Sequence, residues 1–258
     1  GCNAGAELDS GDRNIAIGYG AGQRMSSGQY NVFLGECTAC ACEITGSYNV
    51  VLGQRSGEHL TSGAQNVFLG MDVAGNGIIT GDKNFGGGSM AAWQLTSGQY
   101  NIFFGTCAAK CLTSGHNNII MGRCAGRGQT LTGNVNIILG ACAGYGIQSG
   151  SGNILLGMCA GKDITTGGCN VILGSYAGCS IGAGVNNVFL GKDAGKCWTG
   201  SNQLIIGSGL DQEWITGNAD FNVGIGTTNP NAAVGVGNTA KLSVGIVSAY
   251  QLYGDGSN

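Results

Sequence analysis

The apolar residues of this chain come in short runs that recur along most of its length, each preceded by Asn and followed by Gly. Residues 32–34 (VFL), 119–121 (IIM) and 171–173 (VIL) are examples. Short apolar runs rich in β-branched residues and bounded by Gly and small polar residues predict strands. The close spacing of Gly excludes helices. Each run therefore predicts a strand of about four or five residues.

The leading Asn recurs at a nearly constant spacing, at Asn14, Asn31, Asn49, Asn66, Asn84, Asn101, Asn118, Asn136, Asn153, Asn170 and Asn187. A weaker copy begins at Gln203, and residues 1–13 look like the tail of an earlier copy. Such a period is the signature of a solenoid. We therefore expect an all-β fold: a parallel β-solenoid (β-roll) of 17–18-residue rungs. Residues 1–220 are the predicted array of about 13 rungs, and residues 221–258 are a non-repeat segment.

A second, weaker strand is expected near the LTSG, IITG and ITTG segments of the copies. The Gly of these segments suits corners that need a positive φ. It recurs at Gly46, Gly63, Gly81, Gly98, Gly115, Gly133, Gly150, Gly167, Gly184 and Gly200.

Parallel stacking puts equivalent residues about 4.8 Å apart, so the Asn residues should form a ladder. Stacked amides can hydrogen-bond from rung to rung. Alternatively, Asn marks this position because it tolerates the turn conformation, and both causes can act together. The predicted ladder comprises Asn31, Asn49, Asn66, Asn101, Asn118, Asn136, Asn153, Asn170 and Asn187.

Side chains of a strand alternate between its two faces, and here both faces are apolar. One face should line the lumen and the other should meet another chain, because an exposed apolar stripe of this length is unusual on a monomer. We expect a parallel homotrimer, although a dimer would satisfy the same argument. The third position of each copy is assigned to the core or to the inter-chain contact: Phe33, Phe68, Phe103, Ile120, Ile138, Leu155, Ile172 and Phe189.

One copy breaks this pattern, because Gly86 and Gly87 replace the apolar third and fourth positions. A kink, a bulge or a close approach of chains is expected there. Trp93 is expected to fill the hole, or alternatively to present its ring to a ligand.

Several of the 12 cysteines share the seventh position of their copies, and Cys107, Cys124, Cys142 and Cys159 do so on consecutive rungs. We interpret them as small hydrophobes beside a column of Ala. Cross-links are the main alternative. A zinc site built from Cys37, Cys40, Cys42 and His59 is a weaker one, and no metal or cofactor is predicted.

Composition narrows the function classes. Only 10% of the residues are charged and the formal net charge is -3, which argues against a nucleic-acid groove. No apolar run reaches the length of a membrane span. The 14 acids are scattered, and neither a catalytic Ser, His and Asp grouping nor a phosphate loop is present in the sequence, so we expect no enzyme activity.

The SGxxNVFLGxxAG copies resemble the repeats of tailed-bacteriophage tail fibres, and they are similar in style to the trimeric β-roll heads of bacterial adhesins. Residues 222–244 resemble the segment that joins such repeats to an endosialidase-type intramolecular chaperone, and residues 250–258 continue like cyanophage fibre proteins. The resemblance implies a structural, non-enzymatic fibre shaft or adhesin on a virion or an extracellular surface. Its partners would be copies of itself and a host glycan or protein receptor.

Sugar contacts would favour the loop aromatics Tyr19, Tyr30, Tyr48, Trp93, Tyr100, Trp198 and Trp214. Two alternative functions are weighed against the fibre. One is an ice- or surface-binding solenoid, suggested by Thr61, Thr80, Thr96, Thr113, Thr132, Thr166 and Thr199. The other is a polysaccharide-cleaving tailspike with paired carboxylates, for which Glu58, Asp72, Asp163 and Asp193 are considered.

Overall fold

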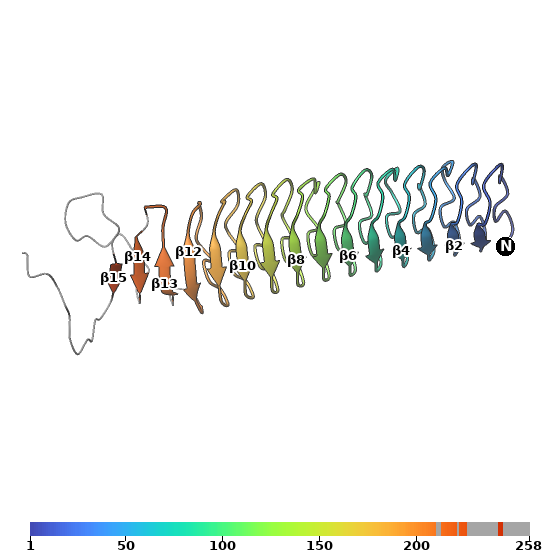
Figure 1. Cartoon of the computed structure of the whole chain (residues 1–258). Helices are drawn as coiled ribbons and strands as arrows, with labels where there is room; N and C mark the ends of the chain where they lie inside the picture. The colour runs from blue at the N-terminus through green and yellow to red at the C-terminus, as the bar shows by residue number, and fades with distance from the viewer. Residues whose placement is uncertain (210–212, 221, 226–241, 245–258) are drawn as a thin grey trace, which may run out of the picture.

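The computed structural model describes residues 1–209, 213–220, 222–225 and 242–244, and it forms a rod-shaped coil (Figure 1). All of its named strands belong to one sheet, in which each strand pairs with its neighbours in sequence. Eleven turns connect the parallel strands β1 to β12, fewer than the thirteen or so expected. Residues 1–13 add part of a further turn, since the Gly5 amide donates to the Ala21 carbonyl at 3.0 Å. The predicted parallel β-solenoid is confirmed.

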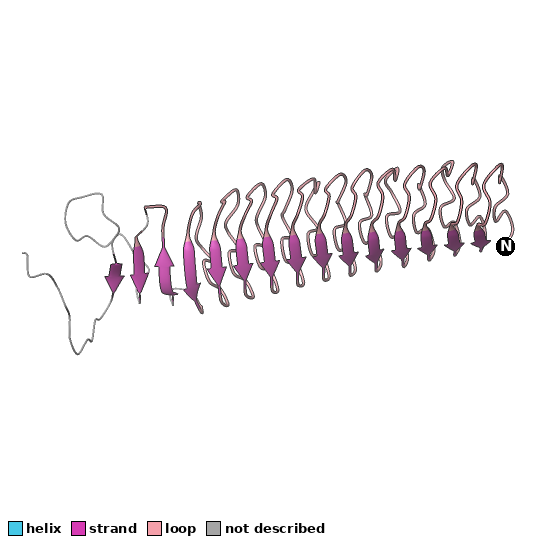
Figure 2. Ribbon diagram, viewed as in Figure 1, coloured by secondary structure: helices cyan, strands magenta, loops and turns pink. Residues whose placement is uncertain are grey.

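The strands are short and lie in a single row along the rod, with the loops of each turn completing the coil (Figure 2). Neighbouring strands pair residue for residue in the longer and the shorter turns alike, as Val50 does with Val32 before it and Val67 after it. Their bounds are β1 (Ile15–Ile17), β2 (Val32–Leu34), β3 (Val50–Leu52), β4 (Val67–Leu69), β5 (Phe85–Gly87), β6 (Ile102–Phe104), β7 (Ile119–Met121), β8 (Ile137–Leu139), β9 (Ile154–Leu156), β10 (Val171–Leu173), β11 (Val188–Leu190) and β12 (Leu204–Gly207).

The direction of the chain changes after β12. The strand β13 (Glu213–Gly217) pairs antiparallel with β12, and β14 (Val223–Ile225) pairs antiparallel with β13. The last strand, β15 (Leu242–Val244), is parallel to β14. Of the segment that resembles a chaperone linker, only residues 222–225 and 242–244 are described, and residues 250–258 lie outside the described part.

The core is a narrow apolar column inside the coil. The middle residue of each strand from β2 to β12 points inward and is buried, so the third-position side chains belong to the core of a single chain. They face a second column of Met, Ile and Leu from the opposite loops, such as Leu112 and Ile164. This second column contains the expected weaker strands only as isolated parallel bridges, for example between Leu112 and Leu131. Burying one such side chain stabilises the fold by about 1.5–3 kcal/mol.

The Asn ladder is present, and it is internal. The side chains from Asn31 to Asn187 are at most 1% exposed. Asn118 illustrates the pattern: its amide nitrogen donates to Asn101 Oδ1 at 3.1 Å and to the Gly133 carbonyl at 2.9 Å. Its own Oδ1 accepts from the backbone and side-chain N–H groups of Asn136 at 2.9 and 3.0 Å. Each amide thus joins two turns and satisfies a buried corner carbonyl.

The corner Gly residues were predicted to need a positive φ, and this reason was wrong. Gly200 has a positive φ, but the other corner Gly residues at this position of the repeat, from Gly46 to Gly184, do not. They are required because the turns approach closely: a Cβ on Gly115 would lie 2.5 Å from the Gly133 carbonyl oxygen. The left-handed conformation occurs elsewhere, for instance at Asn117, the residue before Asn118, with φ 57°. Asn117 is exposed.

A bulge, one of the three alternatives expected at the Gly-rich copy, does not occur. β5 pairs with β4 and β6 without a register shift. The ring of Phe103, not Trp93, occupies the space that a side chain on Gly86 would need. Phe103 also stacks on Phe68, with a distance of 6.2 Å between ring centroids. One large ring therefore fills the core of two turns.

Candidate functional site

The outward face of the strand row is apolar along the whole coil. We call the first and third residues of β1 to β11, with Leu204 and Ile206 of β12, the outer stripe. Apart from Gly87, they are all apolar, and all of them except Gly87 are exposed or half-buried. Phe85 is 44% exposed and Met121 is 41% exposed. The apolar face available to another chain is therefore formed by the first and third strand residues. The fully buried middle residues do not contribute to it.

The outer stripe is about 50 Å long at 4.8 Å per strand and about 10 Å wide, an area of about 500 Å². This lies in the upper part of the range for the largest apolar patch on a monomer, and such patches are often functional. Phe85 and Phe104 meet edge to face above Gly87, with 4.9 Å between their centroids, and so keep the stripe continuous there.

The stacked cysteines lie at a different corner. Cys107, Cys124, Cys142 and Cys159 all have left-handed backbones with φ 55–56°, and each backbone N–H donates to the preceding turn at 2.9 Å. Cys107 is buried and the other three are half-buried. All 12 cysteines lie in the described residues and carry free thiols. Their partial or full burial next to the Ala column is the placement expected of small hydrophobes, and the alternative of cross-links between chains stays a prediction.

The residues considered for a zinc site do not come together, whereas two of the carboxylates considered for catalysis, Glu58 and Asp72, line one cavity. In the described residues, no three His, Cys, Asp or Glu side chains are placed to share a metal ion. The Nδ1 atom of His59 lies 3.0 Å from the Gly75 carbonyl. Asp72 accepts two hydrogen bonds from Arg55, at 2.9 and 3.1 Å. Glu58 and Asp72 both line a small cavity of about 200 Å³. The Asp72 carboxylate in it is already hydrogen-bonded to the Arg55 guanidinium.

The loop aromatics lie on several faces. Tyr30 and Tyr48 stack in parallel with 4.9 Å between centroids, and the Arg13 guanidinium lies 5.0 Å from the Tyr30 ring. Lys83 donates to the Tyr100 hydroxyl at 2.9 Å. Trp198 packs partly buried against the core. The exposed members of the set are Tyr19, Tyr30, Tyr48, Tyr100 and Trp214.

The threonines of the ice-binding alternative occupy two different positions of the repeat. Thr61 and Thr96 are half-buried, and their hydroxyls donate to the carbonyls of the next turn at 2.9 and 3.1 Å. Thr80, Thr132, Thr166 and Thr199 are exposed. They do not form the single flat row that such a surface needs.

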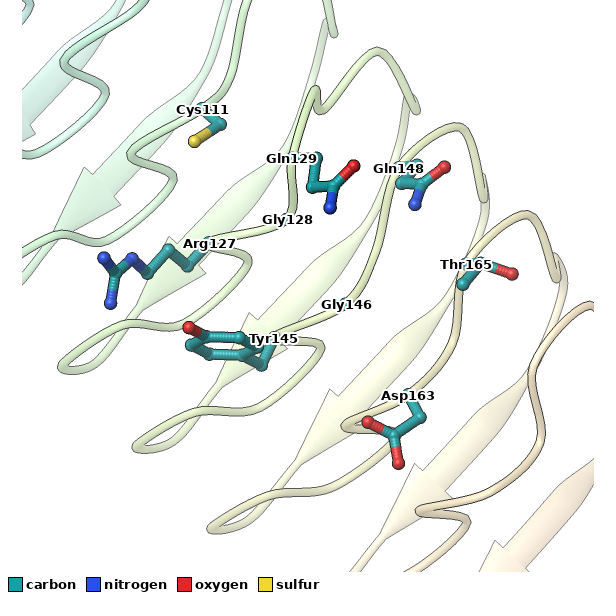
Figure 3. Close-up of a pocket in the computed structure, with 9 residues that line it drawn as sticks. All are labelled: Cys111, Arg127, Gly128, Gln129, Tyr145, Gly146, Gln148, Asp163 and Thr165. Carbon is teal, nitrogen blue, oxygen red and sulfur yellow. The ribbon is translucent and has the colours of Figure 1, made fainter.

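A groove that the sequence did not predict lies across the turns that follow β6 to β9. It encloses about 500 Å³ and is lined by Cys111, Arg127, Gly128, Gln129, Tyr145, Gly146, Gln148, Asp163 and Thr165. Figure 3 shows Arg127 and Tyr145 projecting side by side from adjacent turns, with Gln129 and Gln148 on the other side of the two Gly residues. The Gly positions leave the floor as bare backbone, and the polar groups stand along both walls.

The lining residues of the groove include one cation, Arg127, and one carboxylate, Asp163, so their formal charges balance. The Arg127 guanidinium lies 5.8 Å from the centre of the Tyr145 ring, and attraction to the Tyr145 hydroxyl group raises the pKa of Arg127. Burial raises the pKa of the Cys111 thiol, so this thiol adds no negative charge to the groove at pH 7. Asp163 is the one carboxylate among the lining residues.

A sequence signal for this groove does exist. Residues 84–162 carry Lys110, Arg123, Arg127 and Lys162 but no Asp or Glu, whereas the chain as a whole has a formal net charge of -3. The tenth residue of five successive copies, counted from the Asn, is Trp93, Lys110, Arg127, Tyr145 and Lys162. Charge counted over the whole chain hides this segregation.

No helix among the described residues has the length and apolar character needed to cross a membrane. Comparison of the chain with protein-family models, with curated proteins and with solved structures finds no match.

Proposed function

We propose that this chain is the shaft of a trimeric, non-enzymatic fibre that presents, or takes part in, attachment to a host surface, as a phage tail fibre or a similar appendage does. The observation that carries the proposal is the outer stripe. The coil already has a complete core of its own, yet it presents a second apolar face along its whole length. Burial of that face against identical chains would remove it from water.

The mechanism is mechanical. Each turn of the coil is tied to its neighbours by strand pairing and by the buried Asn ladder, so bending requires many hydrogen bonds to break together. Three parallel copies would also present every surface feature three times, which raises avidity for a repeated receptor. A rod of this kind separates a binding surface from its point of anchorage.

Light scattering of the purified chain, with and without reductant, tests the assembly. We expect three times the 25.9 kDa chain mass in both conditions. The double variant Leu139→Glu/Leu156→Glu places two charges on the outer stripe and should yield monomers with an unchanged β-sheet spectrum. Val135→Glu is the matched control, because Val135 is 61% exposed at another corner of the turn that contains β8. A monomeric wild type, or equal dissociation of the control, would refute the proposed interface.

Attachment and the absence of catalysis are tested separately. Beads coated with the trimer should adhere to host cells, and soluble trimer should compete with them. Incubation with host capsule or lipopolysaccharide should release no new reducing ends. Release of reducing ends would make the chain a polysaccharide-cleaving spike instead.

A further inference from the structure

The turns after β5 to β9 carry a cationic and aromatic ledge. We use this name for Trp93, Lys110, Arg127, Tyr145 and Lys162, which are equivalent residues of successive turns. Two cation–ring contacts organise it: Lys110 lies 5.1 Å from the Trp93 ring, and Arg127 lies 5.8 Å from the Tyr145 ring. At 4.8 Å per turn the ledge is about 19 Å long, enough for a short oligosaccharide.

The groove adjoins this ledge and supplies a different chemistry. The Gln129 and Gln148 amides can each donate and accept hydrogen bonds, and the Thr165 hydroxyl can do both. The Asp163 carboxylate can only accept, so it suits a hydroxyl donor and repels a second anion. A volume of about 500 Å³ falls within the range of small-ligand sites.

Charge along the chain sets a further limit on the ligand. Residues 1–83 carry eight acids and four Lys or Arg, and residues 163–258 carry six acids and three Lys or Arg. The cationic middle segment is therefore bordered by acidic segments. A long polyanion that extended past this segment would be repelled on both sides, so only a short charged stretch can bind here. A chain of acidic sugars fits better than a nucleic acid, because its many hydroxyls match the Gln129, Gln148, Asp163 and Thr165 side chains of the groove.

We infer that the groove and the ledge bind a carboxylate-bearing polysaccharide. Arg127 pairs with a sugar carboxylate through its planar guanidinium, and Lys110 and Lys162 pair with carboxylates one turn and two turns away. The Trp93 and Tyr145 rings pack against the apolar faces of sugar rings, while Gln129, Gln148 and Asp163 bind hydroxyls. The inference rests on the proposed attachment function and gives it a receptor class.

Calorimetric titration of the full-length chain with purified oligogalacturonate tests the inference. Neutral malto-oligosaccharide and a single-stranded oligonucleotide, both of similar length, are the comparison ligands. We expect binding of oligogalacturonate alone, weakened at high salt. Arg127→Gln should weaken it by about 10-fold or more, since a charge-assisted pair is lost. Lys162→Gln, at an exposed position, is the second variant and should weaken it in the same direction.

Arg13→Gln is the matched control. It removes the same charge and a similar Arg–Tyr contact of 5.0 Å, but in the acidic N-terminal segment, so binding should stay within about 2-fold of wild type. An equal loss with Arg13→Gln, equal binding of the neutral sugar, tighter binding of the oligonucleotide, or no binding at millimolar sugar would each overturn the inference. Because the assay uses a purified sugar, these outcomes leave the mass and cell-adhesion tests of the proposed function unchanged.

Discussion

Replacing Asn118 with Asp exchanges one buried nitrogen for an oxygen, and its two N–H donors give way to at most the single O–H of a protonated carboxyl. In the wild type, the nitrogen faces Asn101 Oδ1 at 3.1 Å and the Gly133 carbonyl at 2.9 Å. Asp keeps the shape of Asn and tolerates the same turn conformations. The substitution therefore separates the two explanations for this Asn: the ladder requires a donor, and the turn alone does not.

The size of the effect follows from burial. Asn118 is 0% exposed, so the folded chain should keep the new carboxyl protonated at pH 7. Protonating a carboxyl with an unfolded pKa of about 3.9 costs about 4 kcal/mol at pH 7, at 1.36 kcal/mol per pH unit. Burial raises the folded pKa above the unfolded value, so this cost is absent below about pH 4 and grows as the pH rises toward the folded pKa. The remaining acceptor without a donor adds about 1–2 kcal/mol at every pH.

Guanidinium unfolding followed by circular dichroism, at equal chain concentrations and at about pH 4, 5.5 and 7, measures the difference from wild type. We expect a loss of about 1–2 kcal/mol at pH 4 and about 5 kcal/mol or more at pH 7. Asn117→Asp is the control, because Asn117 is exposed and precedes the ladder residue. It should stay within about 0.5 kcal/mol. A similarly small effect of Asn118→Asp at pH 7 would refute the ladder as a source of stability.

Three further predictions concern packing and thiol chemistry. Gly115→Ala should lower the free energy of unfolding in urea by about 3 kcal/mol, because its Cβ would meet a fixed carbonyl. Gly182→Ala, at a residue with φ 59° and nothing within 4 Å of the new Cβ, should lower it by about 1 kcal/mol. Equal losses would contradict the role of close approach. Gly86→Ala should lower the melting temperature by several degrees, since its Cβ would overlap a buried phenylalanine ring; an unchanged melting temperature would show that the ring can move away. Burial raises the pKa of Cys179 to about 11, so mass spectrometry after alkylation at pH 8 should find exposed Cys169 modified and Cys179 unmodified until the pH is raised; early modification of Cys179 would contradict its burial.

The fold was predictable because the same phrase recurs at nearly constant spacing. The Asn period alone places β1 to β11, with Gln203 marking β12, and the structure confirms parallel, in-register pairing of these strands. The orientation of the strands was not predictable, because Phe68 in the middle and Val67 and Leu69 beside it are all apolar. An alternating pattern cannot show which face of a strand is inside when both faces are apolar. The geometry of the strand determines the orientation, because the buried Asn must share a face with the middle residue.

The corners and the groove show where single-copy patterns fail. Gly115 suggested a positive φ, yet Gly is required at this position because of a close contact with Gly133, the equivalent residue of the next turn. Likewise, Arg127 and Tyr145 belong to successive turns and meet only once the turns stack. Reading the repeat down its columns, and not along its rows, would have revealed both features. Their positions in a single copy carry no sign of either.

In-register pairing holds across the longer and the shorter turns. Each ladder side chain hydrogen-bonds only to the turns directly beside it, as Asn118 does. A gene that lost or duplicated one whole copy would therefore encode a rod of the same cross-section, shorter or longer by about 4.8 Å. The length of the rod would then change in fixed increments of one copy. Most copies could be lost or gained with little change in their contacts, whereas the copy that holds Phe103 could not, because its ring fills the space beside Gly86 of the preceding turn.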